Sequence, residues 1–192
     1  MKSKTILGCV IALFLSISPS VFADVTQWRA EDGGNDHYYN IIVTPLQTWR
    51  DSKDQADKLG GYLASIRSPE ENSWIWNTFN IGGTEAYWAN AADGPVFGAH
   101  RSSDNTPWTW VSGESWNWSN WGWAANSGEA AAQFIHHSTG WDDISVDGGT
   151  SAGGNISFIV EWNGSAVPEP TSAISLLFSL GLLASRRNRK PL

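Results

Sequence analysis

Tryptophan is concentrated in one short stretch of this 192-residue chain. The chain has thirteen tryptophans, and six of them fall within residues 108–123, among Ser, Asn and Gly. Rings at this density can supply most of the apolar area of a loop-rich core, or they can form a stacking platform for a flat or ring-shaped ligand. Burial alone could use all six rings. The alternate spacing of Trp121 and Trp123 places these two rings on one side of an extended segment.

Two other patterns could carry chemistry, but their surroundings do not support it. Residues 149–153 have the Gly-X-Ser-X-Gly spacing of a hydrolase nucleophile elbow. That elbow needs a strand before it and a helix after it, and here it lies in a Gly/Ser-rich loop. His136 and His137 could bind a transition metal, but adjacent residues of a strand point to opposite faces. We therefore predict no catalytic site.

Composition excludes several classes of protein. The only cysteine, Cys9, lies in the leader, so the mature chain has neither a thiol nucleophile nor a cysteine-based metal site. Residues 24–166 contain 18 acidic and 6 basic residues, a net charge of −12. Such a surface repels nucleic acid and anionic membranes, and it favours divalent cations. We expect no nucleic-acid partner.

The N-terminus is typical of a secretory signal peptide. Lys2 and Lys4 precede an apolar run over residues 6–17, and Val21-Phe22-Ala23 follows it. A basic start, a short apolar run and small residues before the break predict cleavage after Ala23. Residues 1–23 are therefore excluded from the folded domain.

The C-terminal segment, residues 167–192, contains three parts in order. Pro168-Glu169-Pro170 is followed by an apolar stretch over residues 171–185 and then by a basic cluster at residues 186–190. As a helix, the apolar stretch spans about 22 Å, short of a hydrocarbon core of about 30 Å. The basic cluster would stay on the cytoplasmic side. An ordinary single-span anchor would have a similar plan.

This order of parts resembles the PEP-CTERM sorting signal of bacterial exported proteins. The resemblance implies a precursor held in the inner membrane by its C-terminal helix. It also implies cleavage near Pro168-Glu169-Pro170 by an exosortase-type enzyme, and delivery to the cell surface or the extracellular matrix. We prefer this interpretation to an ordinary anchor.

Between the two signals we predict one α+β domain, residues 24–166, which begins with a strand and two helices. Residues 38–43 are rich in β-formers and predict a strand that ends at Pro45. Thr48-Trp49-Arg50-Asp51 fits a capping box for a helix that ends at Gly60-Gly61. Ser68-Pro69 then offers an N-cap and a first-turn proline for a helix to about Phe79.

The remaining elements are expected to be short strands. They are predicted at residues 63–66, 87–88, 108–111, 133–136 and 157–162, separated by Gly, Ser and Asn. Two helices followed by short strands is an α+β order. We predict that residues 38–43 and 157–162 pair as antiparallel strands.

The ordered residues over positions 35–162 resemble the C-type lectin-like domain. The matching positions are Trp49, Ala56, residues 59–66, Glu71, Tyr87-Trp88, Trp108-Thr109-Trp110, Ser112-Gly113, Asn117-Trp118, Trp141-Asp142-Asp143 and residues 158–162. The resemblance implies a compact α+β fold with paired first and last strands and a long loop region that carries the ligand site. The tryptophans that it assigns to the core are Trp88, Trp108, Trp110 and Trp141. Small or apolar residues, Ala56, Ala131 and Val160, replace cysteines of many members.

The same resemblance implies a calcium site with an incomplete set of ligands. Lectins of this family hold calcium through a Glu-Pro-Asn or Gln-Pro-Asp segment, a later glutamate and a Trp-Asn-Asp strand. Glu129, Asp142 and Asp143 match the last two parts. Calcium prefers six to eight oxygens, so three carboxylates would need water and backbone carbonyls to complete the site. In the alternative, which we favour, Asp142 and Asp143 bond to loop backbone.

Tryptophans replace the proline segment of the calcium site. Trp121 and Trp123 stand where its ligands would be, and Asn126 would enter the site if the loop were shifted. Indole donates hydrogen bonds and cannot coordinate a cation. We therefore predict a secreted, non-catalytic recognition module that binds its ligand at Trp116, Trp121, Trp123 and Asn126. The leading ligand is an extracellular polysaccharide, and the alternative is a surface or matrix protein bound without sugar or calcium.

Overall fold

The computed structural model of the chain describes residues 25–90, 94–102, 106–123, 125, 128–147 and 155–164. Several predictions concern residues outside these ranges. They are the signal peptide (1–23), the Gly/Ser-rich pattern (149–153), Asn126, and the C-terminal segment (167–192) with Pro168, Glu169 and Pro170. Among the described residues, no helix is both long and apolar enough to cross a membrane.

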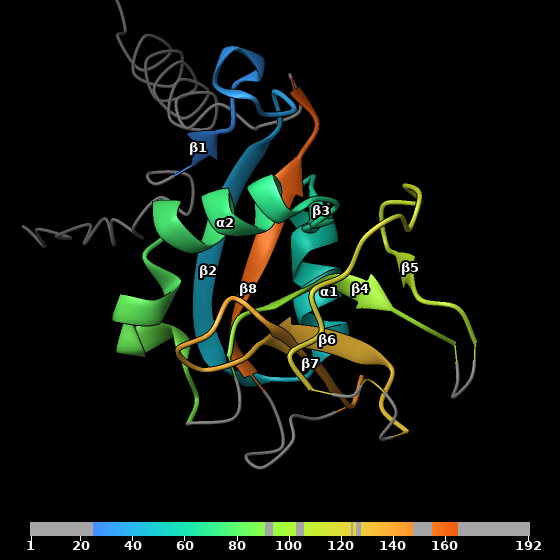
Figure 1. The fold of residues 1–192 in the computed structure, drawn as a ribbon. Coiled ribbons are helices and arrows are strands. Elements are labelled where there is room, and N and C mark those ends of the chain that lie inside the picture. The colour runs from blue at the N-terminus through green and yellow to red at the C-terminus, as the bar shows by residue number, and fades with distance from the viewer. Residues whose placement is uncertain are drawn as a thin grey trace, which may run out of the picture.

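The described residues form one mixed sheet with two helices (Figure 1). The strands are β1 (Thr26–Gln27), β2 (Tyr38–Gln47), β3 (Tyr62–Leu63), β4 (Val96–His100), β5 (Thr109–Trp110), β6 (Ala131–Phe134), β7 (Trp141–Ile144) and β8 (Asn155–Trp162). The helices are α1 (Trp49–Lys58) and α2 (Pro69–Thr78), with short 3-10 helices η1 (Ala30–Asp32), η2 (Ile81–Gly83) and η3 (Glu85–Tyr87). The strand order is β1-β2-β8-β4-β6-β7, with β3 on β8 and β5 on β4.

The first long strand pairs with the last one, as predicted. β2 and β8 are antiparallel from Tyr38 opposite Trp162 to Val43 opposite Ser157. The strand was predicted to end at Pro45, but β2 continues past this proline to Gln47. The register breaks between Val43 and Gln47. Proline is tolerated at such an irregularity because its nitrogen has no hydrogen to donate to the ladder.

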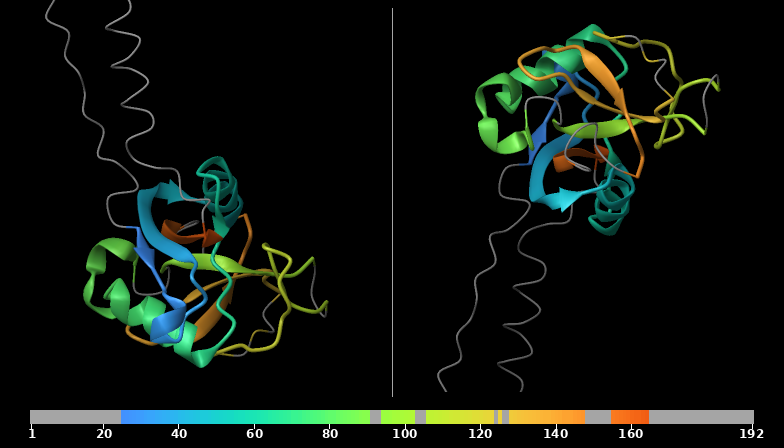
Figure 2. Two further views of the ribbon diagram at one scale, coloured as in Figure 1. Left: turned by 90° about the horizontal axis from the view of Figure 1, so that it is seen from above. Right: turned by 90° about the horizontal axis from the view of Figure 1, so that it is seen from below.

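Each face of the β2–β8 pair is covered by one helix. Successive strand residues point to opposite faces. One apolar cluster draws on β2, β8 and α2, namely Tyr39, Ile41, Ile159 and Ile75. The other draws on β8 and α1, namely Phe158, Val160, Trp162, Trp49 and Ala56. Figure 2 shows α1 and α2 on opposite sides of these strands. The three positions that replace cysteines, Ala56, Ala131 and Val160, are fully buried.

Both helices begin where their capping residues predicted. The Thr48 side chain accepts a hydrogen bond from the Asp51 backbone N–H, and the Asp51 carboxylate accepts one from that of Thr48. The Ser68 side chain accepts from the N–H of Glu71, and Pro69 is the first residue of α2. These caps satisfy N–H groups that have no partner inside a helix.

The short elements deviate more from the predictions. Tyr87 lies in η3, a 3-10 helix, and not in a strand. The strand predicted over 63–66 is confined to Tyr62–Leu63, although the Ala64 N–H still donates to the Ile159 carbonyl at 2.9 Å. β6 ends at Phe134, so His136 and His137 lie in the turn after it. The prediction that His136 lies in a strand, and so points away from His137, was therefore wrong.

Candidate functional site

The long segment between β5 and β6 is held against the core by its tryptophans. Apart from a single bridge between Trp121 and Trp141, its described residues form no helix or strand. The Trp141 N–H donates to the Asn120 carbonyl at 2.8 Å, and the Gly122 N–H donates to the Trp141 carbonyl at 2.9 Å. In Figures 1 and 2 the chain around β5 lies at the side of the molecule away from β1. The segment is therefore a surface loop with a fixed base.

The tryptophans of this region separate by burial. Trp88, Trp110 and Trp141 are buried, as the lectin-like resemblance implied, and Trp108 is half-buried. A loop tryptophan cluster, defined as Trp108, Trp116 and Trp121, packs on this core. Its ring centroids are 4.6 Å apart for Trp108 and Trp121, and 6.1 Å apart for Trp108 and Trp116. These rings lie within the range of favourable aromatic pairs.

Trp123 differs from the other two tryptophans predicted to bind the ligand. Its side chain is 57% exposed, whereas Trp116 and Trp121 are half-buried in the loop tryptophan cluster. The chain therefore presents one open indole beside rings that are partly used for packing. A single exposed tryptophan on a fixed base can stack on a ligand with little loss of conformational freedom.

A buried arginine lies next to the carboxylates predicted to bind calcium. Arg101 is only 7% exposed. Its Nη2 is 3.5 Å from Oδ2 of Asp143, and its Nε donates to the Glu129 backbone carbonyl at 2.8 Å. The guanidinium carbon lies 4.8 Å from the ring centroid of Trp108. A permanent cation therefore already contacts one of the three predicted calcium ligands and stacks on the loop tryptophan cluster.

The three acidic side chains lie close enough to repel one another. The pKa of Asp142 is raised to about 6, first by burial and then by the neighbouring carboxylates of Asp143 and Glu129. Asp142 is also bonded to the side chain of Gln133, its cross-strand neighbour. In the described part of the chain, the ligand atoms of these three carboxylates do not converge within 4.8 Å. The two half-buried carboxylates, Glu129 and Asp142, can accept hydrogen bonds from ligand hydroxyl groups without holding an ion.

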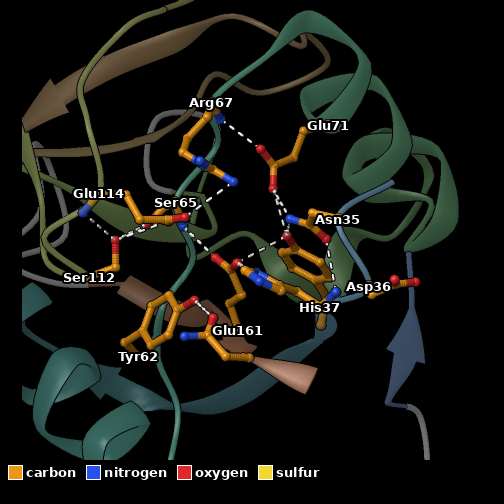
Figure 3. Close-up of polar contacts among 12 residues, drawn as sticks. Asn35, Asp36, His37, Tyr62, Ser65, Arg67, Glu71, Ser112, Glu114 and Glu161 are labelled. Atoms are coloured by element: carbon orange, nitrogen blue, oxygen red, sulfur yellow. Dashed lines mark hydrogen bonds and ion pairs between the residues drawn. The ribbon is translucent and has the colours of Figure 1, made fainter. Parts of the chain in front are cut away.

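A second polar site, which sequence reasoning missed, lies where β2, β8 and α2 meet (Figure 3). Glu161 is fully buried, and Glu71 is nearly so. The Tyr39 hydroxyl donates to Oε1 of Glu71 at 2.6 Å and contacts Oε1 of Glu161 at 3.1 Å. His37 Nδ1 lies 2.5 Å from the same Glu161 oxygen. The one signal in the sequence was a glutamate inside the apolar run of the last strand.

Backbone donors complete this buried network. The Ser65 N–H donates to Oε2 of Glu161, and the Arg67 N–H donates to Oε2 of Glu71, both at 2.8 Å. Asn35 Nδ2 donates to Oε1 of Glu71 at 3.1 Å. The network ties the chain between β3 and α2 to β2 and β8. It is structural in character because these carboxylates are buried and already bonded.

The buried network predicts that stability falls as the pH rises from about 4.5 through about 7. Burial raises the pKa of Glu71 from 4.5 to about 7, and the hydrogen bond to Glu161 raises that of His37 above 6.5. Groups with a raised pKa bind protons more tightly in the folded chain, so stability declines as pH rises through the shifted range. For Glu71 the loss is about 3 kcal/mol. Asp142 acts in the same direction.

Urea unfolding at pH 5 and at pH 8 tests this expectation. The lowered pKa of Asp51 acts below pH 3.8 and does not interfere. Burial lowers the pKa of His100 below 6.5, and this shift opposes the decline in stability below pH 6.5. Glu71→Gln, whose amide does not titrate, should remove most of the difference between the two pH values. Asp57→Asn, which changes an exposed carboxylate, should leave it unchanged. Equal or greater stability at pH 8 in the wild type would contradict the prediction.

Comparison with known proteins supports the C-terminal sorting motif and the fold. A model of the PEP-CTERM protein-sorting motif matches residues 166–190, which include Pro168, Glu169 and Pro170. The match indicates export as a membrane-anchored precursor for an exosortase. A perlucin-like protein of Mytilus galloprovincialis is 32% identical over 78 residues, which are 39% of this chain and 45% of that protein. The match thus spans less than half the length of that relative.

Solved structures show the fold. Human lithostathine superimposes with a TM-score of 0.58 at 18% identity, over 73% of this chain and 89% of that chain. A calcium-independent type II antifreeze protein gives 0.54 at 17%, over 73% and 92%. The C-type lectin CEL-I of Cucumaria echinata gives 0.53 at 18%, over 69% and 94%. The chain therefore has a C-type lectin-like α+β fold, which confirms the predicted fold class.

Proposed function

From this C-type lectin-like fold and its C-terminal PEP-CTERM motif, we propose that the chain is an exported, non-catalytic recognition module that binds extracellular carbohydrate. The observation that carries the proposal is the 57% exposure of Trp123, at the edge of a loop whose other tryptophans are packed. Aromatic faces stack on the apolar faces of sugar rings and lose little freedom in doing so. Trp116, Trp121 and Asn126 complete the proposed ligand-binding set.

Polar groups near the loop tryptophan cluster support a sugar ligand. Asp142 and Glu129 are half-buried carboxylates within electrostatic range of each other. Carboxylates accept hydrogen bonds from hydroxyl groups, and such charge-assisted bonds are the stronger ones. Among the structural neighbours, a receptor domain was solved in complex with an N-glycan. A polysaccharide of the producing cell, with repeated rings and hydroxyl groups, matches this chemistry.

We propose that calcium is not required. The Arg101 guanidinium contacts Asp143, so a positive charge is present without a metal ion. A buried site for a hard cation would need more oxygen ligands than Glu129, Asp142 and Asp143 provide. The calcium-independent antifreeze protein among the neighbours has the same fold. If calcium does bind, these three carboxylates are the ligands we propose.

The alternative is a protein partner in the matrix or on the cell surface. An exposed tryptophan anchors protein interfaces as well as sugars, and this fold does not by itself distinguish the two. A glycan array probed with the purified exported chain, in EDTA and in calcium, tests the proposal. Hits that persist in EDTA support calcium-independent carbohydrate binding. A blank array, together with a protein captured specifically from the cell surface, would favour the alternative.

Processing of the C-terminus gives a separate prediction. Because the PEP-CTERM match covers residues 166–190, we expect the exported pool to lack every peptide from residues 176–192. Mass spectrometry of the secreted and surface fractions measures this. Changing both Pro168 and Pro170 to Ala should hold the uncleaved chain in the inner membrane. Recovery of the intact Arg/Lys-rich terminus from the exported pool would identify an ordinary anchor instead.

A further inference from the structure

Two histidines and a glutamate come together at the turn that joins β6 to β7. We propose that Glu85, His136 and His137 bind a divalent transition-metal ion of the zinc class, at a site that uses none of the proposed ligand-binding residues. One ligand atom from each of the three side chains lies within 4.8 Å of the other two. Glu85 is the first residue of η3, and the histidines follow β6.

The turn brings two adjacent histidines to the same side. The Ser138 N–H donates to the Ile135 carbonyl at 3.0 Å, and the Ile135 N–H donates to the Gly140 carbonyl at 2.9 Å. His137 adopts a left-handed conformation with φ of 57°. Non-glycine residues adopt this conformation infrequently, although histidine does so more often than most. As a result, the ring centroids of His136 and His137 are only 3.7 Å apart.

The carboxylate of Glu85 faces both rings. Its Oε2 lies 3.6 Å from Nε2 of His136, and its Oε1 lies 4.0 Å from Nε2 of His137. Ligand atoms around a tetrahedral zinc ion, with bonds of about 2.0–2.1 Å, are roughly 3.3 Å apart. Glu85 and His137 are 74% and 59% exposed, so both can make this small adjustment.

The surroundings leave both Nε2 atoms available. Nδ1 of His137 lies 3.2 Å from the Gly82 carbonyl, which can only accept a hydrogen bond. Nδ1 therefore carries the proton, and the lone pair of Nε2 is free for a metal, an arrangement common among metal-bound histidines. Nε2 of His136 is buried without a hydrogen-bond partner. Its ring packs edge-on against Trp88 at 4.6 Å, which fixes its direction.

The donor set selects the class of metal. Two imidazole nitrogens and one carboxylate oxygen suit Zn²⁺, Cu²⁺ or Ni²⁺, whereas Ca²⁺ and Mg²⁺ require mostly oxygen ligands. The exposure of His137 and Glu85 leaves a fourth position for water. Gly122, the residue before Trp123, packs closely against Ile135, the residue before His136. A Cβ atom added at Gly122 would lie only 2.6 Å from Cδ1 of Ile135. The metal site thus adjoins the loop that presents Trp123.

Zinc titration of the full chain, purified without a histidine tag, tests the site. In isothermal titration calorimetry we expect one ion per chain. Zinc at about one hundred times its Kd should raise the melting temperature by roughly 5–10 °C over an EDTA baseline. Calcium at the same concentration should have no effect through this site. His137→Gln and Glu85→Gln should each weaken zinc binding at least tenfold.

The zinc affinities of these variants can be compared directly with that of the wild type. His137 and Glu85 are largely exposed, so their replacement should preserve the fold in the absence of zinc. Glu31→Gln, at another exposed carboxylate, should bind zinc like the wild type. Zinc binding that is unchanged in both His137→Gln and Glu85→Gln would place the ion elsewhere and overturn the proposal. Failure of the wild type to bind zinc below about 1 mM would also overturn it.

Discussion

Arg101→Ala is expected to lower the free energy of unfolding by about 3–5 kcal/mol, the range for breaking a buried ion pair. The change removes the guanidinium that contacts Asp143 at 3.5 Å, where both side chains are almost fully buried. It also leaves the Glu129 carbonyl without this donor and removes the cation stacked on Trp108. Urea unfolding monitored by tryptophan fluorescence measures the loss.

Arg50→Ala is the matched control for this experiment. Arg50 also pairs with an aspartate, Asp147, but these side chains are 62% and 70% exposed. Exposed ion pairs contribute about 0–1 kcal/mol. Arg101→Lys should fall between the two, because lysine keeps the charge and loses the planar fork. If Arg101→Ala destabilises the chain no more than Arg50→Ala does, the guanidinium does not stabilise the loop.

Trp123→Ala is expected to weaken binding of the chain to the exopolysaccharide of the producing cell by about 2 kcal/mol or more, which is roughly thirtyfold. Because Trp123 is 57% exposed, its truncation should leave the melting temperature almost unchanged. Leu46→Ala is the control, since Leu46 is an exposed apolar side chain on β2, outside the proposed binding loop. Equal affinities for Trp123→Ala and wild type would exclude this indole as the anchor.

Local sequence signals predicted the elements that depend on local interactions. The caps at Thr48 and Ser68 fixed the starts of both helices, because a cap satisfies backbone groups within a few residues. The β-rich segments 38–43 and 157–162 pair because alternate side chains of both strands pack in the two apolar clusters. Of these segments, only residues 158–162 also carried the resemblance to the C-type lectin-like domain.

Features that depend on contacts between residues far apart in the sequence, or on an unpredicted turn, were missed. β4 was not predicted because Val96, Phe97 and Ala99 are all fully buried, so no alternation of apolar and polar residues marks the strand. The network around Glu71 and Glu161 joins residues far apart in the sequence. The approach of His136 to His137 depends on a turn, whereas His136 was predicted to be the last residue of a strand.

The composition of the loop could not predict which of its tryptophans is exposed. Trp116, Trp121 and Trp123 have similar neighbours in the sequence, yet only Trp123 is mostly exposed. The difference arises because Trp121 forms a β-bridge with Trp141 and its ring packs at a tilt against Trp108, contacts that depend on the folded loop. Arg101, which stacks on the same Trp108, carried no signal that separated it from a surface arginine.

The central claim is that the chain binds carbohydrate through Trp123 without calcium. Equilibrium binding of the purified exported chain to the exopolysaccharide of the producing cell, in EDTA and in millimolar calcium, tests it most directly. We expect the same Kd in both buffers, a Kd at least thirtyfold weaker for Trp123→Ala, and for Asp142→Asn a smaller loss that is the same with and without calcium. Binding that appears only in calcium and is lost in Asp142→Asn, while Trp123→Ala retains wild-type affinity, would contradict a calcium-independent tryptophan platform.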